Sequence, residues 1–149
     1  MRDACGVLDL PGFSRFCIKG AGADEWLRGF VTGGLPKIGR INLVYRADSR
    51  GRVLTEFSCI RLAEDDFVLI TAAGAQWHDG DLLRQNVPDG VAITETTTER
   101  TALLVAGPTS RDVLAPLTDG DLTTGWLTHQ HCKVAGRDAF LIRVSFTGE

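Results

Sequence analysis

The feature that most constrains the fold is a pair of β-prone segments joined by a four-residue turn. Residues 41–47, INLVYRA, and residues 52–62, RVLTEFSCIRL, flank the turn Asp-Ser-Arg-Gly at 48–51. Tight turns favour Asp, Ser and Gly, whereas β-branched and aromatic residues favour extended strands. This region therefore predicts an antiparallel β-hairpin.

Further strands and short helices are predicted on both sides of this hairpin, from the apolar period of each segment. Strands are predicted at 13–19, 66–73, 91–99, 101–107, 131–136 and 138–146, and helices at 25–31, 75–86 and 110–117. We expect 66–73 and 101–107 to be buried, and the helices at 24–32 and 110–117 to pack on a sheet. Because hairpins are mixed with crossovers, we predict an α+β fold, with helices packed on a mixed antiparallel sheet.

Local signals refine the ends and faces of the predicted helices. Asp24 is the expected N-cap of the first helix and Ser110 that of the last, since both residue types accept hydrogen bonds from free helical N–H groups. The apolar faces are expected to consist of Trp26, Leu27 and Phe30 in the first helix, Trp77, Leu82 and Leu83 in the second, and Val113, Leu114 and Leu117 in the third.

Composition limits the classes of protein that this chain can represent. Its 149 residues, 44% hydrophobic and 23% charged, suit one domain with its own core, and we assign no internal boundary within 1–149. The net charge of −3 without a basic run argues against nucleic-acid binding. No apolar stretch approaches the roughly 20 residues of a membrane span, and nothing in residues 1–13 reads as a secretory signal. We therefore expect a cytoplasmic chain that binds neither nucleic acid nor membrane.

No metal site is predicted. The four cysteines, Cys5, Cys17, Cys59 and Cys132, lack C-x-x-C spacing and are expected to be reduced thiols. His129 and His131 would share one face of a strand, where they could bind a metal or simply be polar residues on a half-exposed strand.

Glu56 is the residue with the most unusual position. It lies inside the apolar strand 52–62, where a carboxylate is costly unless it is paired, functional or turned to solvent with Thr55 inward. Arg143, in the apolar stretch FLIRVSF, has the same ambiguity, and Glu149 could be a plain turn residue.

Four ordered segments together resemble the folate-dependent aminomethyltransferase family, typified by the T-protein of the glycine cleavage system. These are GVLDLPGFSRFCIKGAGADEWLRGF, PKIGRINLVYRADSRGRVLTEFSCIRLAEDDFVLITAA, ALLVAGPTSRDVLAPLTDGDL and RVSFTGE. The variants LITAAGAQWHD and RVSFTGE look closer to the folate-binding C-terminal part of dimethylglycine and sarcosine dehydrogenases. In those enzymes an FAD-containing domain oxidises an amine, and the folate module passes the one-carbon unit to tetrahydrofolate.

The resemblance implies a role for four residues. Glu56 matches the second Asp of the family's Asp-Asp pair, which lies beside the reacting folate nitrogens, and Thr55 matches the first. The implied role of Glu56 is catalytic: it would orient the amine, accept its proton and stabilise an iminium, and we expect it to line a cavity. The resemblance also implies that Glu149, Arg143 and Phe146 bind the folate: Glu149 matches the carboxylate that holds the pterin ring, Arg143 matches the Arg preceding it, and Phe146 replaces the usual Tyr.

Other positions depart from the T-protein pattern. Leu43, Ile60 and Ala72 fall where that family has two Tyr and an Asn in the folate site, which argues against T-protein activity as such. The resemblance implies tetrahydrofolate as cofactor and small-molecule partner, with FAD only if a fused or partner amine dehydrogenase domain supplies it.

The resemblance covers about the first half of the family's module, so we expect a fragment of a larger protein. By itself it should bind tetrahydrofolate weakly or not at all and show no measurable catalysis. Two alternatives to one-carbon transfer in an amine dehydrogenase system stay open: a non-catalytic binding module that retains the fold, or a T-protein-like demethylase with another methyl donor.

Overall fold

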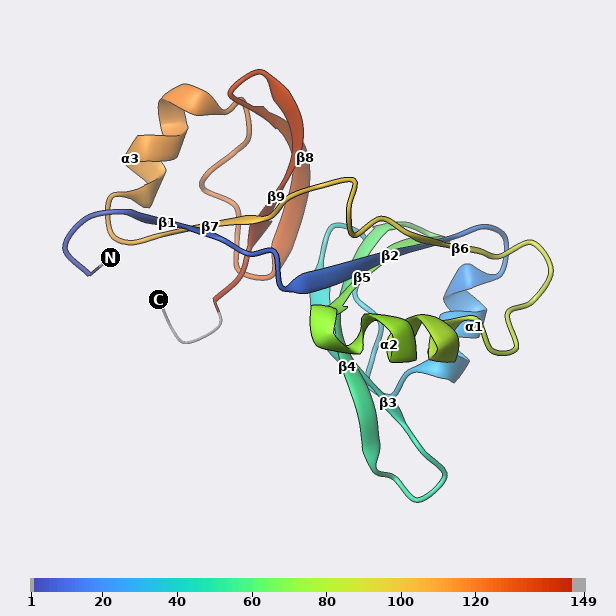
Figure 1. The fold of residues 1–149 in the computed structure, drawn as a ribbon. Helices are drawn as coiled ribbons and strands as arrows, with labels where there is room; N and C mark the ends of the chain where they lie inside the picture. The colour runs from blue at the N-terminus through green and yellow to red at the C-terminus, as the bar shows by residue number, and fades with distance from the viewer. Residues whose placement is uncertain (1, 146–149) are drawn as a thin grey trace. The chain divides into compact units, whose positions relative to one another are not determined.

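The computed structural model describes residues 2–145, and these form two compact units (Figure 1). The described residues of the first unit are 2–10 and 101–145, and the second unit comprises residues 11–100. Both combine antiparallel strand pairs with short helices, which confirms the α+β prediction. No helix of the described residues is long and apolar enough to cross a membrane.

The described part of the second unit contains a five-stranded antiparallel sheet in the order β3-β4-β5-β2-β6. Its strands are β2 (Phe13–Lys19), β3 (Ile41–Ala47), β4 (Val53–Ala63), β5 (Asp66–Ala72) and β6 (Ala92–Glu95). The predicted hairpin is confirmed as β3–β4, and its turn is held by Asp48, whose carboxylate accepts the backbone N–H groups of Arg50 and Arg52. The strand predicted at 66–73 is confirmed as β5, with Phe67, Leu69 and Thr71 buried.

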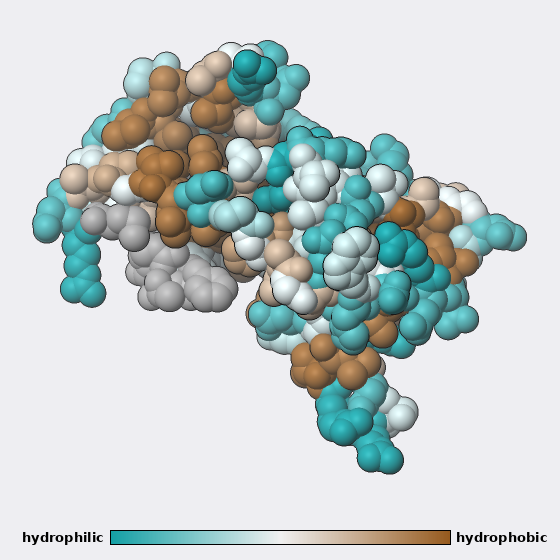
Figure 2. Space-filling view, viewed as in Figure 1, coloured by the Kyte–Doolittle hydropathy of each residue, from teal (hydrophilic) through white to brown (hydrophobic). Residues whose placement is uncertain are grey.

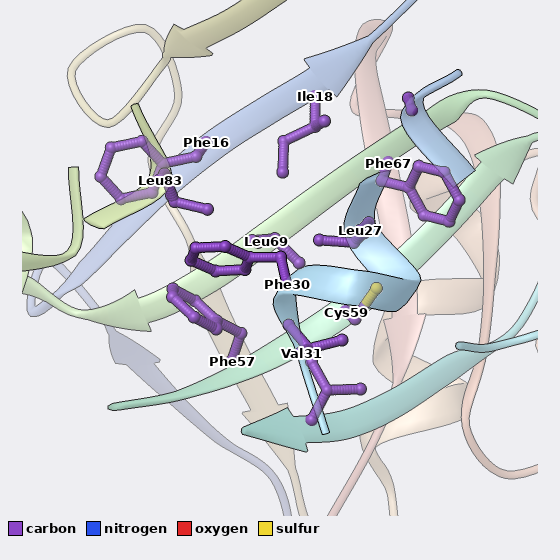
Figure 3. Packing of buried hydrophobic residues seen from close by; sticks show 12 residues of the cluster. Phe16, Ile18, Leu27, Phe30, Val31, Phe57, Cys59, Phe67, Leu69 and Leu83 are labelled. Atoms are coloured by element: carbon purple, nitrogen blue, oxygen red, sulfur yellow. The ribbon is translucent and has the colours of Figure 1, made fainter. Parts of the chain in front are cut away.

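Two helices, α1 (Ala23–Phe30) and α2 (Gln76–Leu83), contribute to the core of this unit. Figure 3 shows the side chains of α1 against those of the central strands. The fully buried side chains of this core include Phe16, Ile18, Leu27, Phe57, Cys59, Phe67, Leu69 and Leu83. Truncation of a large core side chain to Ala costs about 2–5 kcal/mol, so this cluster accounts for much of the unit's stability. Burial also raises the pKa of the Cys59 thiol to about 12, so this cysteine is a core residue.

Helix α1 begins differently from the prediction. Gly22, in the left-handed region at φ 89°, is the N-cap, and Asp24 lies inside the first turn. The capping oxygens come instead from Asp65, in the β4–β5 turn, which accepts the backbone N–H of Asp24 at 2.8 Å and that of Gly22 at 3.4 Å. A carboxylate distant in sequence thus satisfies the free N–H groups that a local cap usually binds.

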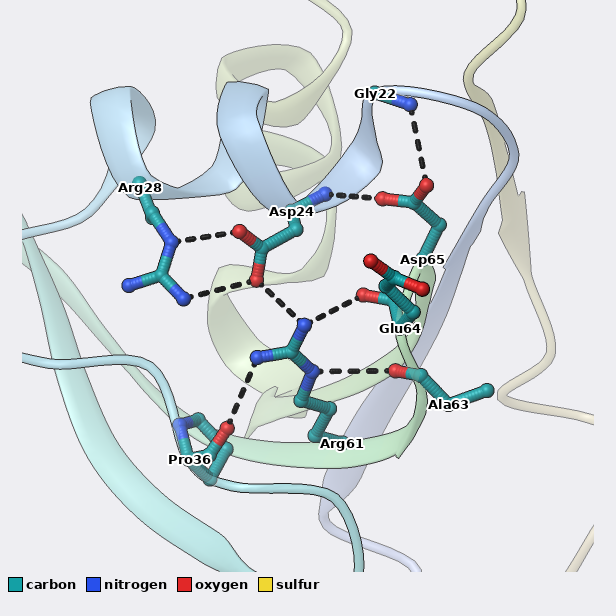
Figure 4. Close-up of polar contacts among 8 residues, drawn as sticks. All are labelled: Gly22, Asp24, Arg28, Pro36, Arg61, Ala63, Glu64 and Asp65. Carbon is teal, nitrogen blue, oxygen red and sulfur yellow. Dashed lines mark hydrogen bonds and ion pairs between the residues drawn. The ribbon is translucent and has the colours of Figure 1, made fainter.

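Arg61 connects α1 to the end of β4 (Figure 4). Its guanidinium pairs with the Asp24 carboxylate at 2.8 Å and donates to the carbonyls of Ala63 at 3.2 Å and Glu64 at 2.8 Å. The same group lies 5.1 Å from the centre of the Phe67 ring. Only 12% of the Arg61 side chain is exposed, so these contacts are largely shielded from water.

The described residues of the first unit form two strand pairs and a short helix. β1 (Gly6–Asp9) pairs with β7 (Leu103–Ala106), and β8 (Thr128–Val134) pairs with β9 (Arg137–Arg143). α3 (Ser110–Leu114) continues into the 3-10 turn Ala115–Leu117. The hairpin predicted between 131–136 and 138–146 is confirmed, and its turn at Ala135 and Gly136 has positive φ at both residues.

Predictions for this unit were wrong in part. The strand predicted at 101–107 is only partly buried: Ala106 is buried, but β1 is its one described strand partner and Leu103 remains 59% exposed. The predicted apolar face of 110–117 is not buried, with Val113 and Leu117 exposed, and the helix begins after Thr109 rather than at Ser110 as N-cap. A two-stranded ribbon has too little surface to cover apolar side chains on both of its faces.

Candidate functional site

Glu56 lies on the face of the five-stranded sheet opposite to α1. Successive residues of a strand point to opposite faces. Phe57 is buried in the α1 core, so Glu56 points away from it and is exposed. We refer to the surface formed by Tyr45, Glu56, Ser58 and Ile70 as the helix-free face.

The neighbours of Glu56 on this face combine polar and apolar groups. Tyr45 on β3 is directly opposite Glu56, and Ile70 on β5 is directly opposite Ser58. Residues opposite each other in an antiparallel pair have Cβ atoms about 4.5–5.5 Å apart. A carboxylate, a phenol, a hydroxyl and an aliphatic side chain are therefore adjacent on one surface. The sequence analysis did not identify Tyr45, although its place opposite Glu56 follows from the hairpin register.

We predicted that Glu56 lines a cavity, and in the described residues its side chain is exposed. Two hollows occur elsewhere in the second unit. One, of about 260 Å³, is lined by Ala21, Gly22, Glu25, Trp26, Asn86 and Pro88. The other, of about 480 Å³, is lined by Leu35, Lys37, Arg40 and Asn42. Glu56 borders neither of them.

The stem of the β3–β4 hairpin beside Glu56 is apolar. Figure 2 shows apolar surface on the projecting hairpin and a hydrophilic tip. Leu43, Val53 and Leu54 are 51%, 61% and 42% exposed. An apolar surface next to a carboxylate lowers the local polarity, which strengthens the interaction of the carboxylate with a bound cation or N–H donor.

The other predicted site residues belong to the first unit or lie outside the described residues. Arg143 is half-buried on β9, and its Nη1 donates a hydrogen bond to the carbonyl of Thr124. In the described residues its guanidinium therefore holds the loop before β8. Phe146 and Glu149 lie outside the described residues, so a site shared by Glu56 and Glu149 stays a prediction.

The sequence analysis missed a buried carboxylate, Asp79, which lies on the other side of the sheet from the Glu56 side chain. Asp79 on α2 is fully buried, and its Oδ2 accepts hydrogen bonds from the hydroxyls of Thr55 at 2.9 Å and Thr71 at 2.6 Å. Its Oδ1 is 2.9 Å from Nδ1 of His78. Three contacts satisfy a charge whose burial would otherwise be costly. Asp79 and Leu83 are four residues apart on α2, and this spacing was the signal that Asp79 faces the sheet.

A second polar chain lies on the same side of the sheet. The buried hydroxyl of Ser14 donates to Oε1 of Gln76 at 3.2 Å, and Nε2 of Gln76 donates to Glu95 at 2.6 Å. The contact between α2 and the sheet is therefore partly polar. Trp77, predicted to lie on the apolar face of this helix, is 79% exposed instead. Among residues 2–145, no cluster of three or more His, Cys, Asp or Glu side chains could hold a metal ion.

Comparison with known proteins places this arrangement in a family. The sequence matches the GCVT N-terminal domain over residues 1–149. It is 34% identical over 150 residues to mitochondrial dimethylglycine dehydrogenase of Rattus norvegicus, covering 97% of this chain and 18% of that protein. It is 31% identical over 164 residues to the sarcosine oxidase alpha subunit of Corynebacterium sp. strain P-1, covering all of this chain and 17% of that subunit.

A solved structure confirms the fold. The glycine cleavage system aminomethyltransferase T of Bartonella henselae superposes with a TM-score of 0.82 at 25% identity, over 99% of this chain and 40% of that one. The chain thus spans less than a fifth of each of the two sequence relatives. It belongs to the GCVT N-terminal domain family, as the four ordered segments indicated.

Proposed function

We propose that this chain forms part of a protein that transfers one-carbon units to tetrahydrofolate, and that the helix-free face forms one wall of the folate site. The observation that supports this most directly is the exposed side chain of Glu56, the residue matched to the family carboxylate, directly opposite Tyr45 in the sheet. The matches to dimethylglycine dehydrogenase and sarcosine oxidase extend the proposal to an amine-oxidising system, in which a separate domain would carry FAD.

The groups on this face suit a reduced pterin. The carboxylate of Glu56 could accept hydrogen bonds from N–H groups and remove a proton from a reacting nitrogen, and it would stabilise the positive charge of an iminium. Ile70 offers an aliphatic surface to a planar ring, and the phenol of Tyr45 can donate or accept a hydrogen bond. Tetrahydrofolate would supply the nucleophilic nitrogens, and this chain would orient them.

The exposure of Glu56 also favours a second candidate, a binding module that retains the fold without the chemistry. Leu43 and Ile60 occupy positions that the resemblance assigns to polar folate-site residues, so fewer hydrogen-bonding groups remain. A demethylase with another methyl donor would use the same face and differ only in the molecule that reacts there.

Titration of the isotope-labelled chain with tetrahydrofolate, followed by nuclear magnetic resonance, tests the proposal. We expect weak binding with shifts concentrated at Tyr45, Glu56, Ser58 and Ile70. Glu56→Gln should reduce these shifts, whereas Glu99→Gln, a matched change at another exposed glutamate, should not. Shifts around Trp26 and Asn86 alone, or no shifts at saturating ligand, would refute the proposed site. Shifts that Glu56→Gln leaves unchanged would favour the non-catalytic module.

A further inference from the structure

β4 loses its regular backbone pairing on both sides near Glu56. On the β5 side, the paired residues end at Ser58 opposite Ile70. On the β3 side, Thr55 is opposite Arg46 and Val53 is opposite Ala47, so Leu54 is an extra residue in the ladder. A bulge of this kind interrupts the hydrogen bonds and redirects neighbouring side chains. The backbone at Thr55 and Glu56 therefore needs support from outside the ladder.

Asp79 provides a contact at this point. Thr55 lies on β4 beyond its last residue paired with β5, and Thr71 lies on β5 just beyond Ile70. Both hydroxyls donate to the same oxygen of Asp79, at 2.9 and 2.6 Å. The carboxylate therefore links the two strands where their paired residues end. Its complete burial excludes competing water, which makes each hydrogen bond more effective.

We propose that Asp79 is a positioning residue for Glu56, acting through Thr55; this inference rests on the function proposed above. Consecutive Cα atoms are about 3.8 Å apart, so fixing Thr55 on α2 also fixes the backbone from which the Glu56 side chain projects. The same constraint sets the distance from Glu56 to Tyr45 across the hairpin. Helix α2 thereby fixes the position of Glu56, although Glu56 lies on the opposite face of the sheet and α2 does not contact it.

Thr55→Val tests the link with little change in shape, because Val replaces the hydroxyl with a methyl group. Thr55→Ser retains the hydroxyl and is the rescue variant, and Thr94→Val is the control at an exposed threonine of β6. Amide hydrogen exchange at residues 53–56 should become roughly five- to tenfold faster in Thr55→Val, as expected for one lost hydrogen bond. Exchange at core residues 67–69 should not change, and Thr55→Ser should restore the slow rate.

The same variants are then titrated with tetrahydrofolate. Thr55→Val should weaken binding at least threefold while Thr55→Ser and Thr94→Val bind like the parent. Unchanged exchange at 53–56, or unchanged binding despite faster exchange, would overturn the positioning role even if the parent binds tetrahydrofolate. Absence of binding by the parent would instead overturn the proposed function, and exchange would still report whether Thr55 is held by Asp79. Asp79→Leu, which has a similar size but no hydrogen-bond acceptor, should reproduce the exchange result of Thr55→Val. If it does not fold, Thr55→Val decides the question.

Discussion

Replacement of Arg61 by Met should destabilise the second unit more than replacement of Arg28, the one arginine of α1, by Met. The unbranched side chain of Met retains much of the aliphatic stem that packs on Phe67 and removes the guanidinium. The loss includes the ion pair with Asp24 at 2.8 Å and the hydrogen bonds to the carbonyls of Ala63 and Glu64. Because the Arg61 side chain is only 12% exposed, water replaces these contacts incompletely.

The magnitude follows from the number and the setting of these contacts. A hydrogen bond from a charged donor contributes about 1.5–3 kcal/mol, and carbonyls in an accessible turn recover part of that by binding water. Asp24 also keeps its contacts with Arg28 at 2.6 and 3.1 Å. We therefore expect Arg61→Met to lower the free energy of unfolding by about 2–4 kcal/mol. Arg61→Lys should lie between Met and the parent, because it keeps the charge and loses the planar fork.

Urea unfolding followed by the fluorescence of Trp26 isolates this unit, provided that Trp77 and Trp126 are first replaced by Phe. With an m-value near 2 kcal/mol per molar, a loss of about 3 kcal/mol lowers the midpoint by about 1.5 M. Arg28→Met is the matched control, because Arg28 binds the same Asp24 carboxylate with 54% of its side chain exposed. Equal midpoints for Arg61→Met and Arg28→Met, at unchanged m-value, would refute the argument from shielding.

Two further predictions concern acid stability and a close backbone approach. The hydrogen bond from Arg28, assisted by the charges of Arg61 and Arg28, holds the pKa of Asp24 below its ordinary value of 3.8. The stabilisation that the charged Asp24 gives is therefore present above about pH 4 and is lost as pH falls toward the lowered pKa. In urea unfolding, the midpoints of Asp24→Asn at pH 6 and at pH 3 should therefore differ less than the midpoints of the parent do. Gly20→Ala should cost about 2–4 kcal/mol, because Gly20 has φ +123° and an added Cβ would lie 1.9 Å from the carbonyl oxygen of Gly90. Gly51→Ala, at φ +77° with no atom within 4 Å of the added Cβ, should cost only about 1–2 kcal/mol, and equal urea midpoints for the two variants would contradict this.

Elements that depend on neighbouring residues were predictable from the sequence. The β3–β4 hairpin followed from a turn whose Asp48 binds the backbone only two and four residues ahead. β5 and the β8–β9 pair followed in the same way from apolar runs and a glycine turn. Each of these segments has a local pattern, a tight turn or an apolar run, that identifies it as a strand without knowledge of distant partners.

The errors arose where partners are distant in sequence. β1 pairs with β7 across roughly a hundred residues, so no local pattern reports the pairing or the exposure of Leu103. The cap of α1 comes from Asp65, about forty residues after the helix begins. Asp79 was missed because its two hydroxyl partners lie on β4 and β5, and only the assembled sheet brings them together.

The orientation and the position of Glu56 have separate physical causes. A one-residue slip of β4 would turn Phe57 to solvent and place the Glu56 carboxylate in the α1 core. Burial of an unpaired charge there costs several kcal/mol, so the hydrophobic core alone decides which face Glu56 occupies. The core does not decide how far the first residues of β4 lie from β5, because the residues paired between these strands begin only at Ser58. That distance depends on Thr55 and Asp79, and a one-carbon transfer site would be sensitive to it, since small displacements of a reacting group cause large losses of rate.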